Sequence, residues 1–155
     1  MSAVTPLPAA SAADCAALTE LSMRSKAHWG YDAALLAAFR PPLTITPALF
    51  AREGFAVVRE GGGFAGLVSV TQEGKMGELA RLFVDPAWMG RGHGAALFGW
   101  AMQTLAASGA AAMRIEADPG AEAFYLRMGA RRIGVAPSEA IPGRMLPLLE
   151  IAPLG

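Results

Sequence analysis

The stretch Leu82-Phe-Val-Asp-Pro-Ala-Trp-Met-Gly-Arg-Gly-His-Gly-Ala-Ala-Leu97 carries the strongest structural signal in the chain. It predicts a strand that ends at Asp85-Pro86, then a glycine-rich loop, then a helix that follows the loop directly. Gly90, Gly92 and Gly94 alternate, so backbone amides in the loop can approach a ligand with no Cβ in the way. The first amides of a helix have no internal partner and carry partial positive charge. The stretch therefore predicts a pyrophosphate site.

Three families of phosphate-binding loop compete for this stretch. A P-loop requires Gly-Lys-[Ser/Thr], which occurs nowhere in the chain. A dinucleotide fold requires a third glycine, but Gly92-His-Gly94 is followed by Ala95-Ala-Leu97. A coenzyme A loop remains, beside the simpler interpretation that the glycines form a turn that starts a helix.

A second motif follows the next predicted strand at the distance that a strand–helix unit requires. It reads Asp118-Pro-Gly-Ala-Glu-Ala-Phe-Tyr-Leu-Arg-Met-Gly129. With this motif the chain resembles the GNAT superfamily of N-acetyltransferases. Members typically carry a V-x-P-x-x-x-G-x-G-x-G loop and an N-x-x-A-x-x-F-Y-x-x-x-G-F helix. The resemblance covers about Phe55 to Gly134, and the first fifty residues match only in helix layout.

The chain departs from the family pattern at three positions. Met89 stands where the loop usually begins with Gln or Arg, Asp118 replaces the usual Asn, and Ala130 replaces an aromatic residue. Met89 removes one side chain but leaves the backbone amides. Asp118 places an amide-type contact to the pantetheine arm in doubt. None of the three changes removes the phosphate cradle.

The wider pattern predicts an α/β (α+β type) fold, a single GNAT-like domain over residues 1–155. We expect a mixed, mostly antiparallel sheet of six to seven strands flanked by about four helices. The predicted strands are Val4–Pro8 (an edge strand), Gly54–Glu60, Phe64–Gln72, Gly77–Asp85, Ala112–Ala117, Arg131–Ala136 and Arg144–Ile151. Gly61-Gly-Gly63 predicts a hairpin turn.

The predicted helices have recognisable ends. Ser11 and Asp32 are expected to cap the first two helices, which run to about Lys26 and to Arg40. Pro41-Pro42 should stop the second helix, because proline cannot continue the hydrogen-bond ladder. A short helix beginning at Thr46-Pro47 competes with a loop there. Two further helices are predicted at Gly90–Ser108 and Ala121–Met128.

Composition excludes several classes of function. Lysine and arginine balance aspartate and glutamate at 13 each, so the basic face expected of a nucleic-acid-binding protein is missing. His28 and His93 lack partners at metal-ligand spacing, which predicts no metal site. No signal peptide or membrane span is predicted, and the single Cys15 suits a reducing compartment, so we expect a cytoplasmic protein without a membrane partner. A homodimer through the edge strands is possible in this fold.

The resemblance implies acetyl-CoA as co-substrate and no metal. Backbone N–H groups of Phe83 and Val84 are expected to bind the pantetheine arm and polarise the thioester carbonyl. The expected cofactor-binding residues are Leu82, Phe83, Val84, Met89, Gly90, Arg91, Gly92, His93, Gly94, Ala95, Asp118, Ala121 and Phe124.

Acetyl transfer requires a neutral amine, and a typical amine has a pKa of about 10, so a base must remove its proton. The resemblance assigns this role to Glu78, acting through a water. Strict alternation places Glu78, Ala80 and Leu82 on one face of their strand. The alternative is a solvated carboxylate at a strand end. For the departing thiolate, the resemblance assigns Tyr125 as general acid, against the alternative of an aromatic core residue.

The family's acceptor site lies between the first two helices and the loop that joins the last two strands. Here these segments are Ser25–Tyr31 and Ser138–Arg144, so His28, Trp29, Tyr31 and Arg144 are the expected substrate-binding residues. Trp29 and Tyr31 could instead be core or turn residues, and Arg144 could bind a substrate carboxylate or pair with Glu150. The resulting hypothesis is an acetyl-CoA-dependent N-acetyltransferase that acts on an unidentified primary amine by direct attack in a ternary complex. The alternative is a non-catalytic acetyl-CoA-binding sensor or interaction module.

Overall fold

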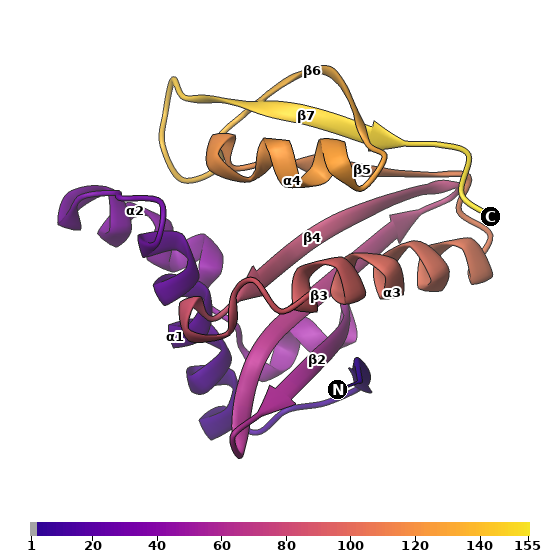
Figure 1. Cartoon of the computed structure of the whole chain (residues 1–155). Helices are drawn as coiled ribbons and strands as arrows, with labels where there is room; N and C mark the ends of the chain where they lie inside the picture. Colours follow the sequence, from indigo (N-terminus) through magenta and orange to yellow (C-terminus); the bar gives the residue numbers. More distant parts are fainter. Residues whose placement is uncertain (1–2) are drawn as a thin grey trace.

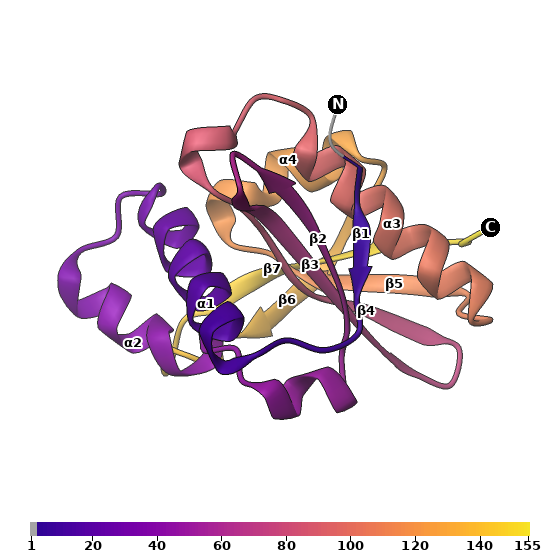
Figure 2. The ribbon, with the colours of Figure 1, turned by 90° about the horizontal axis from the view of Figure 1, so that it is seen from below.

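The predicted strands join into one mixed sheet in the computed structural model, which describes residues 3–155. The strand order is β1-β2-β3-β4-β5-β7-β6, and every neighbouring pair is antiparallel except β4 and β5, which are parallel. The strands are β1 (Thr5–Leu7), β2 (Gly54–Glu60), β3 (Gly63–Glu73), β4 (Met76–Val84), β5 (Ala112–Glu116), β6 (Arg131–Pro137) and β7 (Met145–Ile151). The predicted fold class is thereby confirmed, with β1 at one edge as expected (Figure 2).

Within residues 3–155, four α-helices and three short 3-10 helices accompany the sheet. They are α1 (Ala12–Ala27), α2 (Ala33–Leu43), α3 (His93–Ala107), α4 (Glu122–Arg127), η1 (Pro47–Ala51), η2 (Pro86–Trp88) and η3 (Pro119–Ala121). Both predicted caps are present. The Ser11 hydroxyl accepts a hydrogen bond from the amide of Asp14 at 3.1 Å, and the Asp32 carboxylate accepts one from the amide of Leu35 at 2.9 Å. These bonds satisfy amides that the helices themselves leave unpaired.

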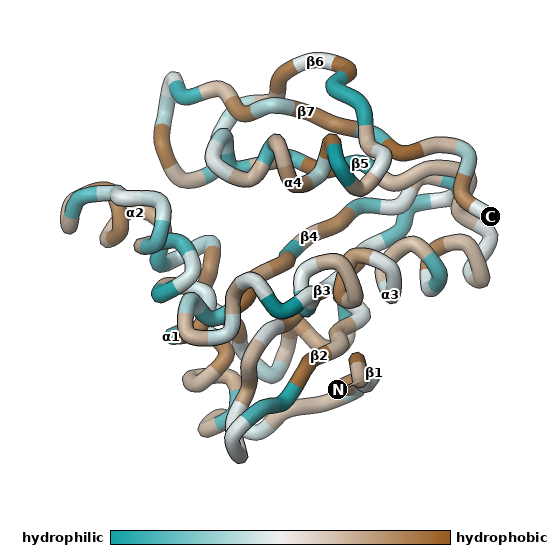
Figure 3. The backbone as a smooth tube through the Cα atoms, viewed as in Figure 1, coloured by the Kyte–Doolittle hydropathy of each residue, from teal (hydrophilic) through white to brown (hydrophobic). Residues whose placement is uncertain are grey.

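Each face of the sheet has its own apolar core. The α3 and α4 face is centred on Phe98, Leu97, Met113 and Leu149, all fully buried. The α1 face is centred on Leu18, Leu21 and Leu67. The hydropathy colours show apolar stretches along β4 and β7 and hydrophilic stretches along α1 and α2 (Figure 3). The sheet is therefore a layer between two cores, and residues that alternate along a strand belong to different cores.

The parallel pair β4–β5 is joined over only a short length. Met76, Gly77 and Glu78 pair with Ala112, Met113 and Arg114, and beyond this point the two strands diverge (Figure 1). A bulge accompanies the divergence, because Leu79 pairs with Val70 and Arg81 with Ser69, which leaves Ala80 as an extra residue on β4. From Leu79 to Val84, the side of β4 that faces β5 has no strand partner in residues 3–155.

The bulge corrects one prediction about faces. Glu78 lies opposite Thr71, and after the extra residue Leu82 lies opposite Val68, whose side chain belongs to the other core. Glu78 and Leu82 are therefore on different faces, although strict alternation placed them on one. A bulge reverses the alternation of every residue that follows it.

Two predicted helix boundaries are also wrong. The third helix begins at His93 rather than Gly90, because Gly90 and Gly92 have φ of +79° and +85°, which no right-handed helix contains. The second helix continues through Pro41-Pro42 to Leu43. Prolines can adopt helical φ, and here they occupy the last turn, so the hydrogen bonds that they remove lie at the end of the helix.

The packing of Phe98 provides a test of the fold. Phe98 of α3 is fully buried, whereas Leu126 of α4 is 47% exposed. We expect Phe98→Ala to lower the free energy of unfolding by about 3–5 kcal/mol, because the change leaves a cavity in a close-packed core. The matched control Leu126→Ala should change it by about 0.5 kcal/mol or less. Urea denaturation followed by circular dichroism measures both, and equal losses would contradict this account of the core.

Candidate active site

The divergence of β4 from β5 opens a cavity of about 450 Å³. Its walls come from the C-terminal end of α1, the second half of β4, the loop before α3, the end of β5, and α4. The lining residues are Ser25, Lys26, Trp29, Leu79–Val84, Trp88, Met89, Gly90, Gly92–Ala95, Ile115, Glu116, Asp118, Ala121, Phe124, Tyr125 and Arg127. The cavity therefore joins the two sequence motifs that lie about thirty residues apart.

One end of the cavity is the glycine-rich loop. Asp85 caps η2 by accepting a hydrogen bond from the amide of Ala87 at 3.0 Å. Arg24 of α1 forms an ion pair with the same carboxylate at 2.7 Å. A Cβ at Gly90 or Gly92 would meet no atom within 4 Å, so the space beside both glycines is open. The α3 helix starts directly after Gly92, which has no side chain that could cap the first amides of the helix. The loop and the first turn of α3 thus present free backbone amides to an open volume, as an anion-binding site requires.

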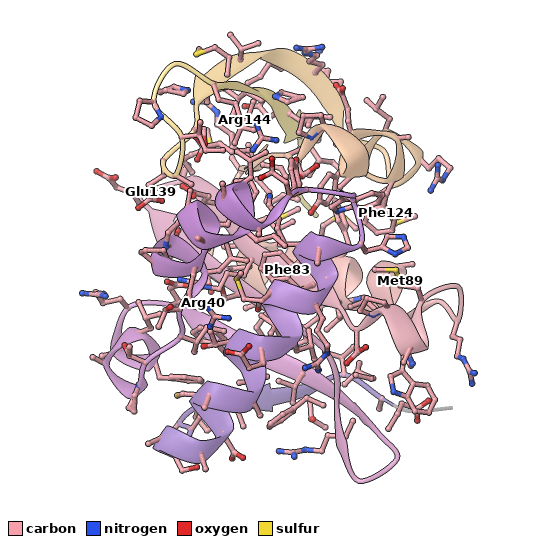
Figure 4. All side chains as sticks on the ribbon, turned by 90° about the vertical axis from the view of Figure 1, so that its left-hand side faces the viewer. Arg40, Phe83, Met89, Phe124, Glu139 and Arg144 are labelled. Carbon is pink, nitrogen blue, oxygen red and sulfur yellow. The ribbon has the colours of Figure 1, made fainter. Side chains whose placement is uncertain are left out.

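The next glycine has a different role. A Cβ at Gly94 would lie 3.4 Å from the ring of Phe124, so α3 and α4 approach each other closely at this point. Figure 4 shows Phe124 and Met89 on the same side of the site, with Phe83 behind α1. The small residue at position 94 lets the loop and α4 form one continuous wall.

Two loop residues that were expected to contact the cofactor point elsewhere. Arg91 is exposed and lies outside the cavity lining, with its guanidinium 4.8 Å from the centre of the Trp88 ring. The ring of His93 is buried, and its Nε2 lies 3.5 Å from a carboxylate oxygen of Glu60 at the end of β2. His93 lines the cavity, but its imidazole is directed at β2.

Tyr125 is buried between α4 and α3, with only 6% of its surface exposed. Its ring packs against Phe98 and Phe124 at centroid distances of 5.9 Å and 5.2 Å. Burial and the negative charge of Asp118 raise the pKa of its hydroxyl above the ordinary range. Tyr125 therefore faces the cavity as a neutral phenol that can donate a proton.

Glu78 lies on the α1 and α2 face of β4 and outside the cavity lining. Partial desolvation and the nearby carboxylates Glu116, Glu53 and Glu139 raise its pKa. Glu116 also lines the cavity, and Glu53 is paired with Arg81 at 3.1 Å. Glu78 thus stands next to the cavity in a region of negative charge, rather than inside it.

Asp118 is the most densely bonded carboxylate at the cavity. It accepts hydrogen bonds from Nζ of Lys26 at 2.7 Å, from the hydroxyl of Tyr31 at 2.7 Å, and from the amide of Gly120 at 2.8 Å. These bonds outweigh burial and lower its pKa. Arg144 in turn donates to the Tyr31 hydroxyl at 2.5 Å. Of the two partners considered for Arg144, Glu150 is instead paired with Arg114 at 3.2 Å.

The four expected substrate-binding residues lie at different distances from the cavity wall. Trp29 alone lines the cavity, where its ring lies so close to Gly120 that a Cβ there would be 2.8 Å from it. His28 packs edge-on against Trp29, and Tyr31 packs against Phe39. Tyr31 and Arg144 are joined to each other outside the lining.

Sequence reasoning also missed several lining residues. Arg81, Trp88, Glu116 and Arg127 were not among the expected site residues. Trp88 could have been found, because it lies inside the glycine-rich stretch. Arg81 could not, because the bulge at Ala80 determines its direction. Within residues 3–155, no group of His, Cys, Asp and Glu side chains is arranged to hold a metal, and no helix is long and apolar enough to span a membrane.

Solved structures share this fold. A GCN5-related N-acetyltransferase from Rhodopseudomonas palustris superposes with a TM-score of 0.77 at 17% identity, covering 98% of this chain and 96% of that one. The CoA complex of the paia N-acetyltransferase from Thermoplasma acidophilum also gives 0.77, at 14% identity and 97% and 99% coverage. An aminoglycoside 6'-N-acetyltransferase complexed with CoA gives 0.69 at 13% identity, with 96% of both chains covered. At these identities, the likeness establishes the fold.

The family itself is established by sequence. The family model described as "Acetyltransferase (GNAT) domain" matches residues 48–140, more than half of the chain. No curated protein sequence gives a significant match. The chain belongs to the GNAT acetyltransferase family, and the resemblance inferred from the two motifs is confirmed.

Proposed function

We propose that the protein transfers an acetyl group from acetyl-CoA to a primary amine by direct attack within a ternary complex. The observation that carries this proposal is the cavity between β4 and β5, which has the glycine-rich loop at one end, open space beside Gly90 and Gly92, and Tyr125 in its wall. The CoA complexes of two proteins with the same fold support the choice of co-substrate.

The chain offers each part of acetyl-CoA a matching surface. The pyrophosphate suits the amides from Met89 to Ala95, since no side chain occupies the space beside Gly90 and Gly92. The pantetheine arm suits the β5 side of β4 beyond Glu78, where alternate N–H and C=O groups lack a strand partner in residues 3–155. It extends to Ala121 of η3 and Phe124 of α4. Amides of Phe83 and Val84 then polarise the thioester carbonyl. When bound, acetyl-CoA would supply the acetyl group that the amine receives.

We assign Glu78 as the base that removes a proton from the amine through a water. Its raised pKa brings the carboxylate closer to the working pH of a general base, while leaving it ionised above that pKa. Its position outside the lining favours a relayed proton over direct contact. The neighbouring carboxylates Glu116 and Glu139 also favour a positively charged acceptor in this region.

We assign Tyr125 as the acid that holds a proton for the departing sulfur. The raised pKa keeps the phenol protonated throughout the ordinary range of pH. The conjugate acid of a thiolate has a pKa of about 8.5, so a thiolate is a weaker base than the buried tyrosinate. Burial therefore slows full proton transfer from Tyr125 to the sulfur, but it keeps the hydroxyl protonated as a hydrogen-bond donor.

A non-catalytic acetyl-CoA sensor would use the same loop and cavity. Thiol release from acetyl-CoA in the presence of an amine panel discriminates between the two functions, since only the enzyme consumes the thioester. A cytoplasmic location, a homodimer and the absence of nucleic-acid and membrane partners remain predictions from the sequence.

The first prediction concerns the phosphate loop. Gly92→Asp places a carboxylate and a Cβ beside the proposed pyrophosphate site, so CoA affinity should fall by about tenfold or more, because like charges repel. Gly62→Asp is the matched control, since Gly62 has a similar φ of +81°, lies in the β2–β3 turn and pays the same backbone penalty. Isothermal titration measures both affinities. Equal affinities in the two variants would place the phosphate site elsewhere.

The second prediction concerns Tyr125. Tyr125→Phe keeps the packing of the ring and removes only the hydroxyl, so kcat should fall by about a hundredfold to ten-thousandfold while CoA affinity changes little. Steady-state thiol release gives kcat, and calorimetry gives the affinity. If the variant turns over at the wild-type rate, Tyr125 is a packing residue.

The third prediction concerns the pH dependence of the base. A base must be ionised, so kcat should rise with pH through the pKa of Glu78, at a higher pH than an unperturbed carboxyl would give. Glu78→Gln should lower the rate by about a hundredfold or more and remove this limb, with partial recovery at high pH, where solvent deprotonates the amine. Glu73→Gln, at the exposed end of β3, should leave the profile unchanged. An unaltered profile in Glu78→Gln would exclude Glu78 as the base.

A further inference from the structure

Four side chains connect the two halves of the molecule on the α1 and α2 side of the cavity. Lys26 lies in the last turn of α1, Tyr31 in the α1–α2 loop, Asp118 between β5 and η3, and Arg144 directly before β7. Lys26 and Tyr31 both donate to Asp118, and Arg144 donates to Tyr31. We call these four residues the cross-cleft clasp, because β4 and β5 diverge beneath them.

The Lys26–Asp118 pair of the clasp is largely shielded from solvent, which distinguishes it from an ordinary surface ion pair. The side chains of Lys26 and Asp118 are 13% and 10% exposed. Phe39 of α2 lies underneath, with Nζ of Lys26 at 4.5 Å and Cζ of Arg144 at 5.4 Å from the centre of its ring. By comparison, the pair of Arg40 and Glu20, which joins α1 to α2, is 49% and 52% exposed. A desolvated pair holds its partners in one geometry far more strictly than an exposed pair does.

The clasp acts on the turn that starts α4. The other oxygen of Asp118 accepts a hydrogen bond from the amide of Gly120 and so caps the start of η3. The η3 turn leads without interruption into α4. The ring of Trp29, three residues after Lys26, packs directly on Gly120. The end of α1 therefore holds the Asp118–Gly120 turn by a buried ion pair and by ring contact. Seven residues after Asp118, the same short segment carries Tyr125.

The segment is also held from β6, where Arg132 lies 3.8 Å from the carboxylate of Glu122. The α4 helix has only six residues and no side-chain cap at its start. Isolated helices of this length are unstable in water, so tertiary contacts must fix their position. Phe124 and Tyr125 supply such contacts on the α3 side, and the clasp supplies them on the α1 side.

We propose that Asp118 is a positioning residue, which through the clasp fixes α4, and with it the Tyr125 hydroxyl, relative to the β4 wall of the cavity. The proposal rests on the proposed function. Both oxygens of Asp118 are engaged by groups of the chain itself, so its role differs from that of a residue that contacts the pantetheine arm. A displacement of about 1 Å at a reacting centre can cost about a hundredfold in rate.

The test uses Asp118→Asn, Lys26→Met and the double variant. Asparagine keeps the size of the side chain and its acceptor for Gly120, but removes the charge opposite Lys26. We expect each single variant to lower kcat by about ten- to a hundredfold, with the KM for acetyl-CoA changed by about twofold or less. The double variant should be no worse than the poorer single variant, because both changes break the same contact. Glu20→Gln, which breaks the exposed α1–α2 pair, is the matched control and should keep the wild-type kcat.

The acceptor in this test is whichever of spermidine, L-lysine and an alanyl peptide gives the fastest thiol release with the wild-type protein. Rates are divided by the number of CoA sites found by calorimetry, so that partial unfolding does not count as lost activity. A purely structural role would lower the melting temperature and leave this normalised kcat unchanged. An increase in the KM for acetyl-CoA that matches the loss in kcat/KM would instead indicate a direct cofactor contact. Either result overturns the proposal.

Hydrogen exchange provides a readout that needs no acceptor. In the full-length protein, Asp118→Asn and Lys26→Met should speed the exchange of backbone amides in residues 119–128, while Glu20→Gln leaves that segment unchanged. Wild-type exchange in both clasp variants would overturn the proposal even if no amine is turned over. A wild-type protein that fails to bind CoA would refute the proposed function, whereas the exchange result would still show whether the clasp holds α4.

Discussion

The short pairing between β4 and β5 is the constraint on which the site depends. Three residue pairs join the strands, and the extra residue Ala80 then separates their paths. The separation leaves backbone groups of β4 without a strand partner, and such groups are costly to bury unless a ligand or water satisfies them. It also creates the cavity between two well-packed cores. A continuous sheet with the same side chains would have no site.

The sequence predicted those parts of the fold and the site that depend on local patterns. The glycine loop could be read because backbone freedom at Gly90 and Gly92 is a property of those residues, and the caps Ser11 and Asp32 act within one turn. The bulge at Ala80 could not be read, since a strand pattern of period two contains no mark of an extra residue. The partners of Asp118 could not be predicted either, because Lys26 lies 92 residues away in the chain.

The cavity separates two electrostatic environments. At the loop, partial positive charge comes from backbone amides and the start of α3, which suits a pyrophosphate. On the α1 and α2 side of β4, Glu78 lies among other carboxylates whose influence raises its pKa, which suits an amine that arrives as a cation. Tyr125 faces the space between them. In the proposed reaction, the cofactor and the acceptor approach from environments of opposite charge and meet at the point where β4 and β5 diverge.

A crystal structure of the protein with bound acetyl-CoA tests the central claim most directly. The account predicts density for the pyrophosphate on the amides of residues 89–95, for the pantetheine arm along β4 beyond Glu78, and for the acetyl group beside Tyr125. A cofactor bound outside the β4–β5 cavity, or with its pyrophosphate away from the glycine loop, would contradict it.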